Sequence, residues 1–527
     1  MSLMSSMSRT LRQALGMVIP YKDIASTLDI KTPLSQEMQL ALLTWHSMYT
    51  NHSPWAGDVN IKSLNLAALV SSELSRQITL ESEYHISSKE LAENGHDMAI
   101  NERSEYLTQE FQKLWDKLRQ KVELGMGAGG ILIKPYPRNG HIYFDCCPDW
   151  EIYPLSFDDD GNLDDVIFPE TYAKGNDYYT RLERHTREGD AIHVTQKAYK
   201  SSSPVNLGTE IPLTEVDRWA GLEPEATVNF PEGMLFGWFK VAMANNVDVE
   251  CPMGVSCFSR ATEMIKECDL QYSRLSWEFE GSELAIDVDP TVLRPSKTDG
   301  KQELPRLNER LFRAVDIQGG TGEGDFYKVF SPSIRDQSII NGLNHMLQRV
   351  EDLCGLSRGS ISQLDHTTDS KTATELRIMR QRSYATVADN QTALDRCLKD
   401  VVKVMDFYAT AYQLAPEGSY ECSFEWDDSI LVDTEVQLNE RLTLLNAGAE
   451  SKVNLRRWYF GETEAQAKAA IAQINDEEAE RMTAMSKGLD DSLPTYGSPV
   501  PSTAHRQSEP NRTDDSRLPG NEPKKDE

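Results

Sequence analysis

Two glycine-rich stretches are the first candidates for chemistry, because glycine loops can hold phosphate groups. Residues 125–130 match the G-x-G-x-x-G pattern of dinucleotide-binding proteins. Such a site needs a strand before the glycines and a helix after them, so that the phosphate meets a helix N-terminus. Here a helical pattern precedes the glycines and strand-like residues 131–133 follow. The second stretch, 319–324, lacks the Gly-Lys-Ser/Thr of a P-loop. We therefore predict glycine turns and no nucleotide cofactor.

Metal-binding and catalytic motifs are the next candidates for chemistry. Residues 158–162 (DDDGN) look at first like a calcium loop, but an EF-hand register on Gly161 begins at Ser156 and places Ile167 where the bidentate glutamate belongs. An Asp-Gly turn is the better interpretation. The sequence has no H-E-x-x-H, Cys/His cluster, C-x-x-C pair, G-x-S-x-G elbow or metal-spaced carboxylate motif. These patterns predict no catalytic residues, no metal and no cofactor, and hence a protein that is not an enzyme.

Charge and composition narrow the class of protein further. The 527 residues carry a formal net charge of −29, which argues against a conventional nucleic-acid binder with a basic face. The eight cysteines are expected to be reduced and mostly buried. No signal peptide and no apolar run of about 18 residues is recognised, which predicts a soluble, cytoplasm-made protein without a membrane segment.

A very long helix is the main element predicted to position a functional surface. Apolar residues recur at three- and four-residue steps over 376–412, and no proline interrupts residues 372–414. Thr372 and Glu375 have the spacing of a capping box at its start. Such a helix would span about 60 Å, so we expect a kink or a second element that supports it.

Two further helices and a strand-rich region complete the predicted elements. An amphipathic helix over 339–353 ends at Gly355, and a polar, flexible stretch joins it to the long helix. A helical stripe of about 25 residues precedes residue 280. Strands and turns are expected from 131 to about 199, with an Asn-Gly hairpin at residues 139–140.

These segments, in this order, resemble the portal proteins of tailed bacteriophages, in the branch of long-tailed phages with GLS and TATE segments. The resemblance is carried by residues 355–360 (GLSRGS), by residues 371–375 (KTATE) and by residues 254–272, and it extends over about residues 10–480. It implies an α+β portal-protein fold assembled as a cyclic ring, usually of twelve subunits. The ring would form a channel at one capsid vertex for DNA packaging and ejection, and a docking platform for other virion proteins.

The resemblance also implies an order of parts along the chain. The first part is an N-terminal wing over 1–253, with a β-rich part at 131–200. A first stem helix over 254–280, a clip over 281–333, a second stem helix over 334–355 and a channel (tunnel) loop over 356–371 follow. The chain then continues with a long helix and the rest of the wing over 372–450, a crown over 451–485 and, from its composition, a disordered tail over 486–527.

Three sets of residues follow as expected sites. The channel loop, which would touch a passing duplex weakly, comprises Ser357, Arg358, Ser360, Ser362, Gln363, Asp365, His366, Thr367, Thr368, Asp369, Ser370 and Lys371. The basic face of the clip comprises Arg294, Lys297, Lys301, Arg306, Arg310 and Arg313. The helices of the ring interface carry Phe258, Ile265, Leu347 and Leu394. The loop has no lysine cluster, so we do not expect it to grip phosphates tightly.

The implied partners are double-stranded DNA passing non-specifically, the terminase large subunit, a head-tail adaptor, and the major capsid and scaffolding proteins. The protein would lie in the virion after synthesis in the bacterial host cytoplasm. The alternative interpretation is an acidic helical scaffolding or adaptor protein of a virion. Such a protein would not need two long helices flanking a basic β insert. A further alternative is an enzyme, including a nuclease or protease fused to a capsid protein, but the sequence lacks the catalytic motifs that such an enzyme would need.

Overall fold

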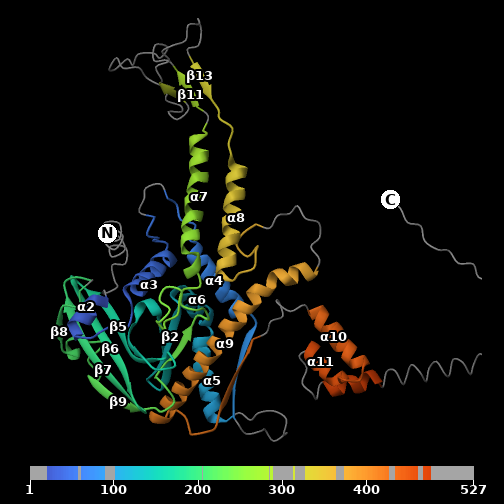
Figure 1. Ribbon diagram of the computed structural model, residues 1–527. Coiled ribbons are helices and arrows are strands. Elements are labelled where there is room, and N and C mark those ends of the chain that lie inside the picture. Colours follow the sequence, from blue (N-terminus) through green and yellow to red (C-terminus); the bar gives the residue numbers. More distant parts are fainter. Residues whose placement is uncertain are drawn as a thin grey trace, which may run out of the picture. The chain divides into compact units, whose positions relative to one another are not determined.

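The computed structural model describes residues 21–56, 61–88, 101–204, 206–283, 285–288, 312–314, 327–363, 373–426, 434–460 and 467–475 (Figure 1). The chain forms two compact units, unit 1 (Met1–Val432) and unit 2 (Asp433–Glu527). Both helices and strands are abundant, as the α+β prediction requires. No helix in these described ranges is long and apolar enough to cross a membrane.

The helices of unit 1 surround and fill its core. They are α2 (Tyr21–Leu28), α3 (Gln36–Tyr49), α4 (Leu66–Ile78), α5 (Glu102–Trp115), α6 (Leu118–Ala128), α7 (Thr262–Gly281), α8 (Asp336–Cys354) and α9 (Ala373–Ala411). Short 3-10 turns lie at Asp149–Glu151, Leu213–Glu215 and Ser259–Ala261. The start of α5 shows why these helices form where they do: the side chains of Asn101 and Ser104 each accept the other residue's backbone N–H in a capping box.

The strands of unit 1 that the structure describes form four separate sheets. The largest has the order β4 (Tyr153–Phe157), β5 (Leu163–Lys174), β6 (Asp177–Glu188), β7 (Ala191–Ser201) and β8 (Thr209–Ile211), with β9 (Glu225–Asn229) also paired to β7. The second is β10 (Gly237–Lys240), β2 (Gly130–Arg138) and β3 (His141–Pro148); the third is β1 (Ser82–Ser87) with β14 (Glu421–Trp426). The fourth is β12 (Phe312–Ala314), β11 (Ala285–Val288) and β13 (Tyr327–Phe330).

The predicted hairpin at Asn139 and Gly140 is confirmed. Arg138 pairs with His141 across the turn, and both turn residues have positive φ, 52° and 80°. Two central residues with positive φ are what a tight two-residue hairpin requires, because that turn matches the twist of its strands. The β2–β3 sheet then forms one wall of the core.

The long helix is also confirmed, as α9, and it lies at the centre of the core. Its fully buried apolar side chains are Val387, Leu394, Cys397, Leu398, Val401, Val402, Val404, Met405 and Ala409. We expected a helix of this length to be kinked or supported by another element, and α9 is contacted by β10, β2, α4, α5 and β14. A Cβ added to Gly237 on β10 would lie 2.3 Å from the Cys397 carbonyl oxygen, so only glycine allows this approach.

Helices α7 and α8 run side by side in opposite directions, with β11 and β13 at the far end of the pair (Figure 1). Near that end, Arg335 donates to the Glu278 carboxylate through Nε (3.1 Å) and Nη2 (2.9 Å). At the other end, the buried Asp269 carboxylate accepts the Trp55 Nε1 and Leu64 N–H groups, both at 2.8 Å. The first contact joins the two helices to each other, and the second joins α7 to the segment that precedes α4.

The first stem helix begins later than predicted. We expected a helix over 254–280, but α7 starts at Thr262, directly after a turn at residues 257–258 and the 3-10 turn at Ser259–Ala261. Gly254 lies directly against Gly129, since a Cβ on Gly254 would be 2.0 Å from the Gly129 carbonyl oxygen. The two backbones are therefore in direct contact at this point. Of the predicted clip, only β11, β12, β13 and their immediate neighbours lie within the described residues.

Unit 2 contains α10 (Thr434–Asn446), α11 (Lys452–Phe460) and a helical stretch over 467–475. Gly448, with φ 73°, lies in the turn between the first two helices. The unit begins at Asp433, whereas the predicted boundary between wing and crown stood at 450/451. α10 packs against α11 and therefore belongs to this unit. The predicted tail, 486–527, lies outside the described residues.

Candidate functional site

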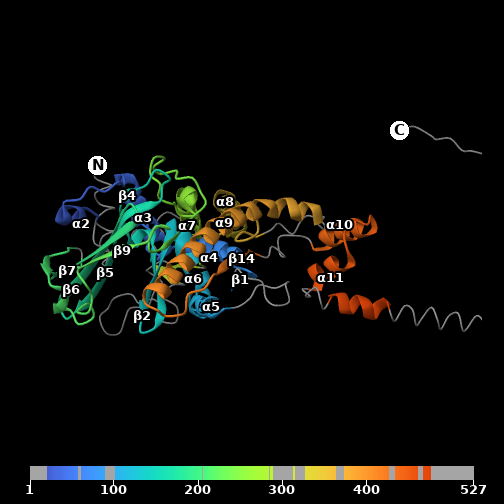
Figure 2. The same ribbon diagram turned by 90° about the horizontal axis from the view of Figure 1, so that it is seen from below.

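The candidate site is the loop root, residues 355–363, which follows α8 and leads toward α9. Figure 1 shows the segment that follows α8 on the side of that helix away from the six-stranded sheet, and Figure 2 shows α8 and α9 next to each other. Gly355 ends α8 with φ 75°, and its N–H donates to the Glu351 carbonyl. A Cβ there would lie 2.4 Å from Thr386 Oγ1 on α9. Glycine is therefore required both for the left-handed turn and for the close approach to α9.

Glu351 holds the middle of the loop root. Its side chain is fully buried, and Oε1 accepts the N–H groups of Ile361 (2.6 Å) and Ser362 (2.8 Å). Oε2 accepts the Ser362 hydroxyl at 2.7 Å, and the Gly359 N–H lies 3.2 Å from both oxygens. A buried carboxylate is tolerated when donors surround it in this way. The loop root therefore folds around one side chain of α8.

Asp352, the next residue, binds arginines from three segments. Arg358 Nη2 lies 2.9 Å from Oδ2, Arg382 Nη1 lies 3.1 Å from Oδ1, and Arg349 Nη1 lies 3.9 Å from Oδ2. The Arg358 guanidinium, with help from the other two, holds the pKa of Asp352 below its ordinary value. Helix, loop root and α9 thus meet at this carboxylate.

Two more pairs complete the attachment of the loop root. The Ser357 N–H and Oγ both lie within hydrogen-bond distance of Ser383 Oγ on α9, at 2.6 and 2.9 Å. Asn344 on α8 accepts the Gln363 N–H at 2.7 Å and donates to its carbonyl at 2.9 Å. We predicted a flexible polar stretch here, and residues 355–363 correct that expectation because hydrogen bonds hold them at both ends.

The remaining loop predictions lie outside the described residues. They are Asp365, His366, Thr367, Thr368, Asp369, Ser370 and Lys371, together with the predicted cap at Thr372. Five residues of the predicted basic clip face also lie outside the described residues: Arg294, Lys297, Lys301, Arg306 and Arg310. Arg313 lies on β12, where it pairs with Asp287 of β11 in the sheet register.

The residues predicted for a ring interface lie elsewhere than expected. Phe258, Ile265 and Leu394 are at most 2% exposed and pack in the core of unit 1. Their burial leaves no surface for a neighbouring subunit, which corrects their assignment to an interface. Leu347 on α8 is partly buried against the same core. Trp277 (66%) and Phe279 (49%) on α7 are among the large apolar side chains of this region that are exposed.

Sequence reasoning missed Glu351, Asp352, Arg349, Arg382, Asn344 and Ser383. One signal was available: two acidic residues occupy the last turn of α8, where the helix dipole disfavours negative charge. Such a pair is stable when donors or cations satisfy it, and here the loop root supplies both. The partners themselves are not adjacent in sequence and could not be identified from a local pattern.

The glycine stretch and the acidic turn have the local structure that was predicted. α6 ends at Gly129, φ 102°, and β2 begins at Gly130, so the glycine stretch is a helix-to-strand turn. Asp158 accepts the backbone N–H groups of Asp160 (3.0 Å) and Asn162 (2.7 Å) in an acidic turn. Among the residues that the structure describes, no group of three His, Cys, Asp or Glu side chains is arranged to hold a metal ion.

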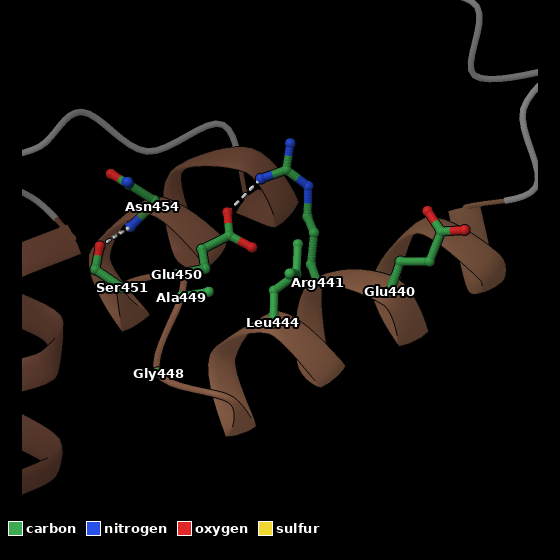
Figure 3. A pocket seen from close by; sticks show the side chains of 8 residues that line it. All are labelled: Glu440, Arg441, Leu444, Gly448, Ala449, Glu450, Ser451 and Asn454. Atoms are coloured by element: carbon green, nitrogen blue, oxygen red, sulfur yellow. Dashed lines mark hydrogen bonds and ion pairs between the residues drawn. The ribbon is translucent and has the colours of Figure 1, made fainter.

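Unit 2 has a groove that opens to solvent between α10 and α11 (Figure 3). It is lined by Glu440, Arg441, Leu444, Gly448, Ala449, Glu450, Ser451 and Asn454. Arg441 Nη1 lies 2.6 Å from Glu450 Oε1, and Ser451 Oγ accepts the Asn454 N–H at 3.1 Å. The first contact joins α10 to the turn before α11 and the second lies at the start of α11, so both belong to the helical hairpin itself.

Two antiparallel helices that carry a small sheet, a hydrogen-bonded loop root and a long core helix are the main parts of this α+β fold. The chain belongs to the phage portal protein family. The family model that matches is described as phage portal protein, SPP1 Gp6-like, and it covers residues 68–486 of 527. That range includes α7, α8, the loop root, α9 and most of unit 2. A comparison with curated proteins gives no match.

Proposed function

We propose that this chain is the portal subunit of a tailed phage, and that copies of it form a ring around a DNA channel at one capsid vertex. The family match over 68–486 carries this proposal. The family is structural rather than enzymatic. In this role the protein passes double-stranded DNA during packaging and ejection, and it catalyses no reaction itself.

The paired helices α7 and α8 act as the stem in this proposal, and the β11–β13 region acts as the clip. The clip meets the terminase large subunit and later a head-tail adaptor, while other surfaces meet the major capsid and scaffolding proteins. The channel loop extends from the loop root, whose hydrogen bonds to Glu351 and Asp352 give it a fixed base on α8. A loop whose base is fixed keeps its place while a duplex moves past it.

Neighbouring subunits meet along the stem in this arrangement. Trp277 and Phe279 expose large apolar surfaces on α7, and such surfaces gain free energy when a partner covers them. Contacts of this kind, repeated head to tail around a cyclic axis, close into a ring.

The native mass of the purified chain, together with negative-stain images, tests the proposal. Twelve copies of a 59.5 kDa chain give a particle of about 700 kDa with a central hole. A compact dimer without a channel, under varied salt and concentration, would contradict the portal assignment and favour an adaptor role.

A further inference from the structure

Three arginine side chains converge at the loop root although they are separated in sequence. Arg349 on α8, Arg358 in the loop root and Arg382 on α9 all contact the Asp352 carboxylate, and we call them the arginine cluster. Their side chains are 59%, 55% and 59% exposed, whereas that of Asp352 is only 15% exposed. The acidic residue is covered, and the cationic groups face solvent.

The cluster keeps an excess of positive charge. Three guanidinium groups face the single carboxylate of Asp352. The buried Glu351 carboxylate also influences Arg358, but its oxygens are occupied by the N–H groups of the loop root. Even with both acids counted, the described groups here sum to one positive charge. This local sign is opposite to the charge of −29 on the chain.

We infer that the arginine cluster is a contact site for the phosphate backbone of double-stranded DNA, an inference that rests on the channel role proposed above. A guanidinium has five N–H donors in a planar fork that matches phosphate oxygens. Asp352 engages part of each fork, as the Nη2 contact of Arg358 and the Nη1 contact of Arg382 show. The remaining donors are available to a second anion.

Asp352 and Asn344 make the site suited to a moving ligand. Because Asp352 neutralises part of the charge, each phosphate contact is weaker than with free arginines. The guanidinium groups stay in place because Asp352 fixes two of them by hydrogen bonds. Asn344 fixes the end of the loop root on the same helix. Such contacts are independent of sequence, as a duplex sliding past the site requires.

Association of the assembled full-length protein with a labelled 30-base-pair duplex, measured by fluorescence anisotropy over a range of salt concentrations, tests the inference. The test variant is Arg349→Gln with Arg358→Gln and Arg382→Gln. Each lost phosphate contact lowers the slope of log K against log salt by about 0.9. We expect the slope to fall by at least about one, which is about tenfold in affinity at 0.1 M salt.

Two controls separate charge from structure. Arg119→Gln with Lys174→Gln and Arg187→Gln removes the same charge from other elements of unit 1, and this variant is expected to keep the wild-type slope. Replacing the three cluster arginines with lysine retains the charge and is expected to restore most of the slope. Native mass and thermal unfolding of each variant show whether the assembly is intact.

A second variant covers the case in which the triple glutamine variant does not assemble. Asp352→Asn leaves all three arginines but removes the opposing charge, so duplex association should tighten at low salt. If assembled Asp352→Asn or the assembled glutamine variant associates like the wild type, the inference fails while the ring stands. Wild-type rings that bind polyglutamate but not duplex DNA would also overturn it. Absence of any ring in the wild type would instead overturn the proposed function.

Discussion

Glu351 and Ser362, eleven residues apart, are joined by two hydrogen bonds, one from the Ser362 N–H and one from its hydroxyl, at 2.8 and 2.7 Å. The first residue lies on α8 and the second in the loop root. Because the carboxylate is buried, these bonds replace its contacts with water. Glu351 therefore fixes the middle of the loop root on α8.

Replacing Glu351 with glutamine should loosen the loop root. An amide turns one acceptor oxygen into an NH₂ donor, which then faces the N–H groups of residues 359–362. The cost should be about 1–3 kcal/mol of unfolding free energy. Thermal unfolding and faster amide exchange at Ile361 and Ser362 would show it. Glu267→Gln, at an exposed position of α7, is the matched control and should change neither. Equal exchange rates in both variants would contradict the role of Glu351.

Asp149 should make the protein less stable as the pH rises. It is fully buried, Oδ1 accepts the Trp238 Nε1–H at 3.1 Å, and Oδ2 has no partner within the described structure. Burial raises its pKa from the ordinary 3.8 to about 8. Between these two values the folded chain holds a proton that the unfolded chain releases, so stability falls with pH by up to about 1.4 kcal/mol per unit.

Asp149→Asn should remove this dependence. We expect the melting temperature of the wild type to fall more than that of the variant between pH 6 and pH 9. Asp159→Asn, at an exposed position in the neighbouring acidic turn, should behave like the wild type. Parallel curves for wild type and Asp149→Asn would show that this carboxyl does not gain its proton on folding.

Gly237→Ala should destabilise the core. The new Cβ would meet the Cys397 carbonyl oxygen of α9 at 2.3 Å, and neither backbone can move without shifting a sheet or the central helix. Overpacking of this kind costs about 1–3 kcal/mol. Gly221→Ala, whose Cβ would meet nothing within 4 Å, is the control and should be neutral. Denaturant unfolding compares the two, and a neutral Gly237→Ala would contradict the close packing of β10 on α9.

Trp277→Ser combined with Phe279→Ser should weaken ring assembly while the subunit stays folded. Both side chains are exposed on α7, so their loss removes little from the core. At an interface, each would contribute about 1–3 kcal/mol. Native mass at several concentrations measures the effect. Tyr412→Ser, 62% exposed beyond the end of α9, serves as the control. Rings that form equally well in both variants would place the interface elsewhere.

The sequence by itself determined the elements whose causes are local. Helix periodicity predicted α8 and α9, the Asn139–Gly140 pair predicted the β2–β3 hairpin, and the order of helix before strand identified the glycine stretch as a turn. These features depend on neighbours within one or two turns of chain. The family resemblance followed from the same local segments in their order, and the family match bears it out.

Only the tertiary structure decided which residues meet. The arginine cluster draws Arg349, Arg358 and Arg382 from three segments around Asp352, and no spacing in the sequence marks that group. Apolar periodicity predicts a helix, but it does not tell whether the apolar face of that helix packs in the core or against another subunit. The structure shows that Leu394 is buried in the core of its own subunit. Contacts between distant segments form only when the chain folds, because each depends on the packing of all the others.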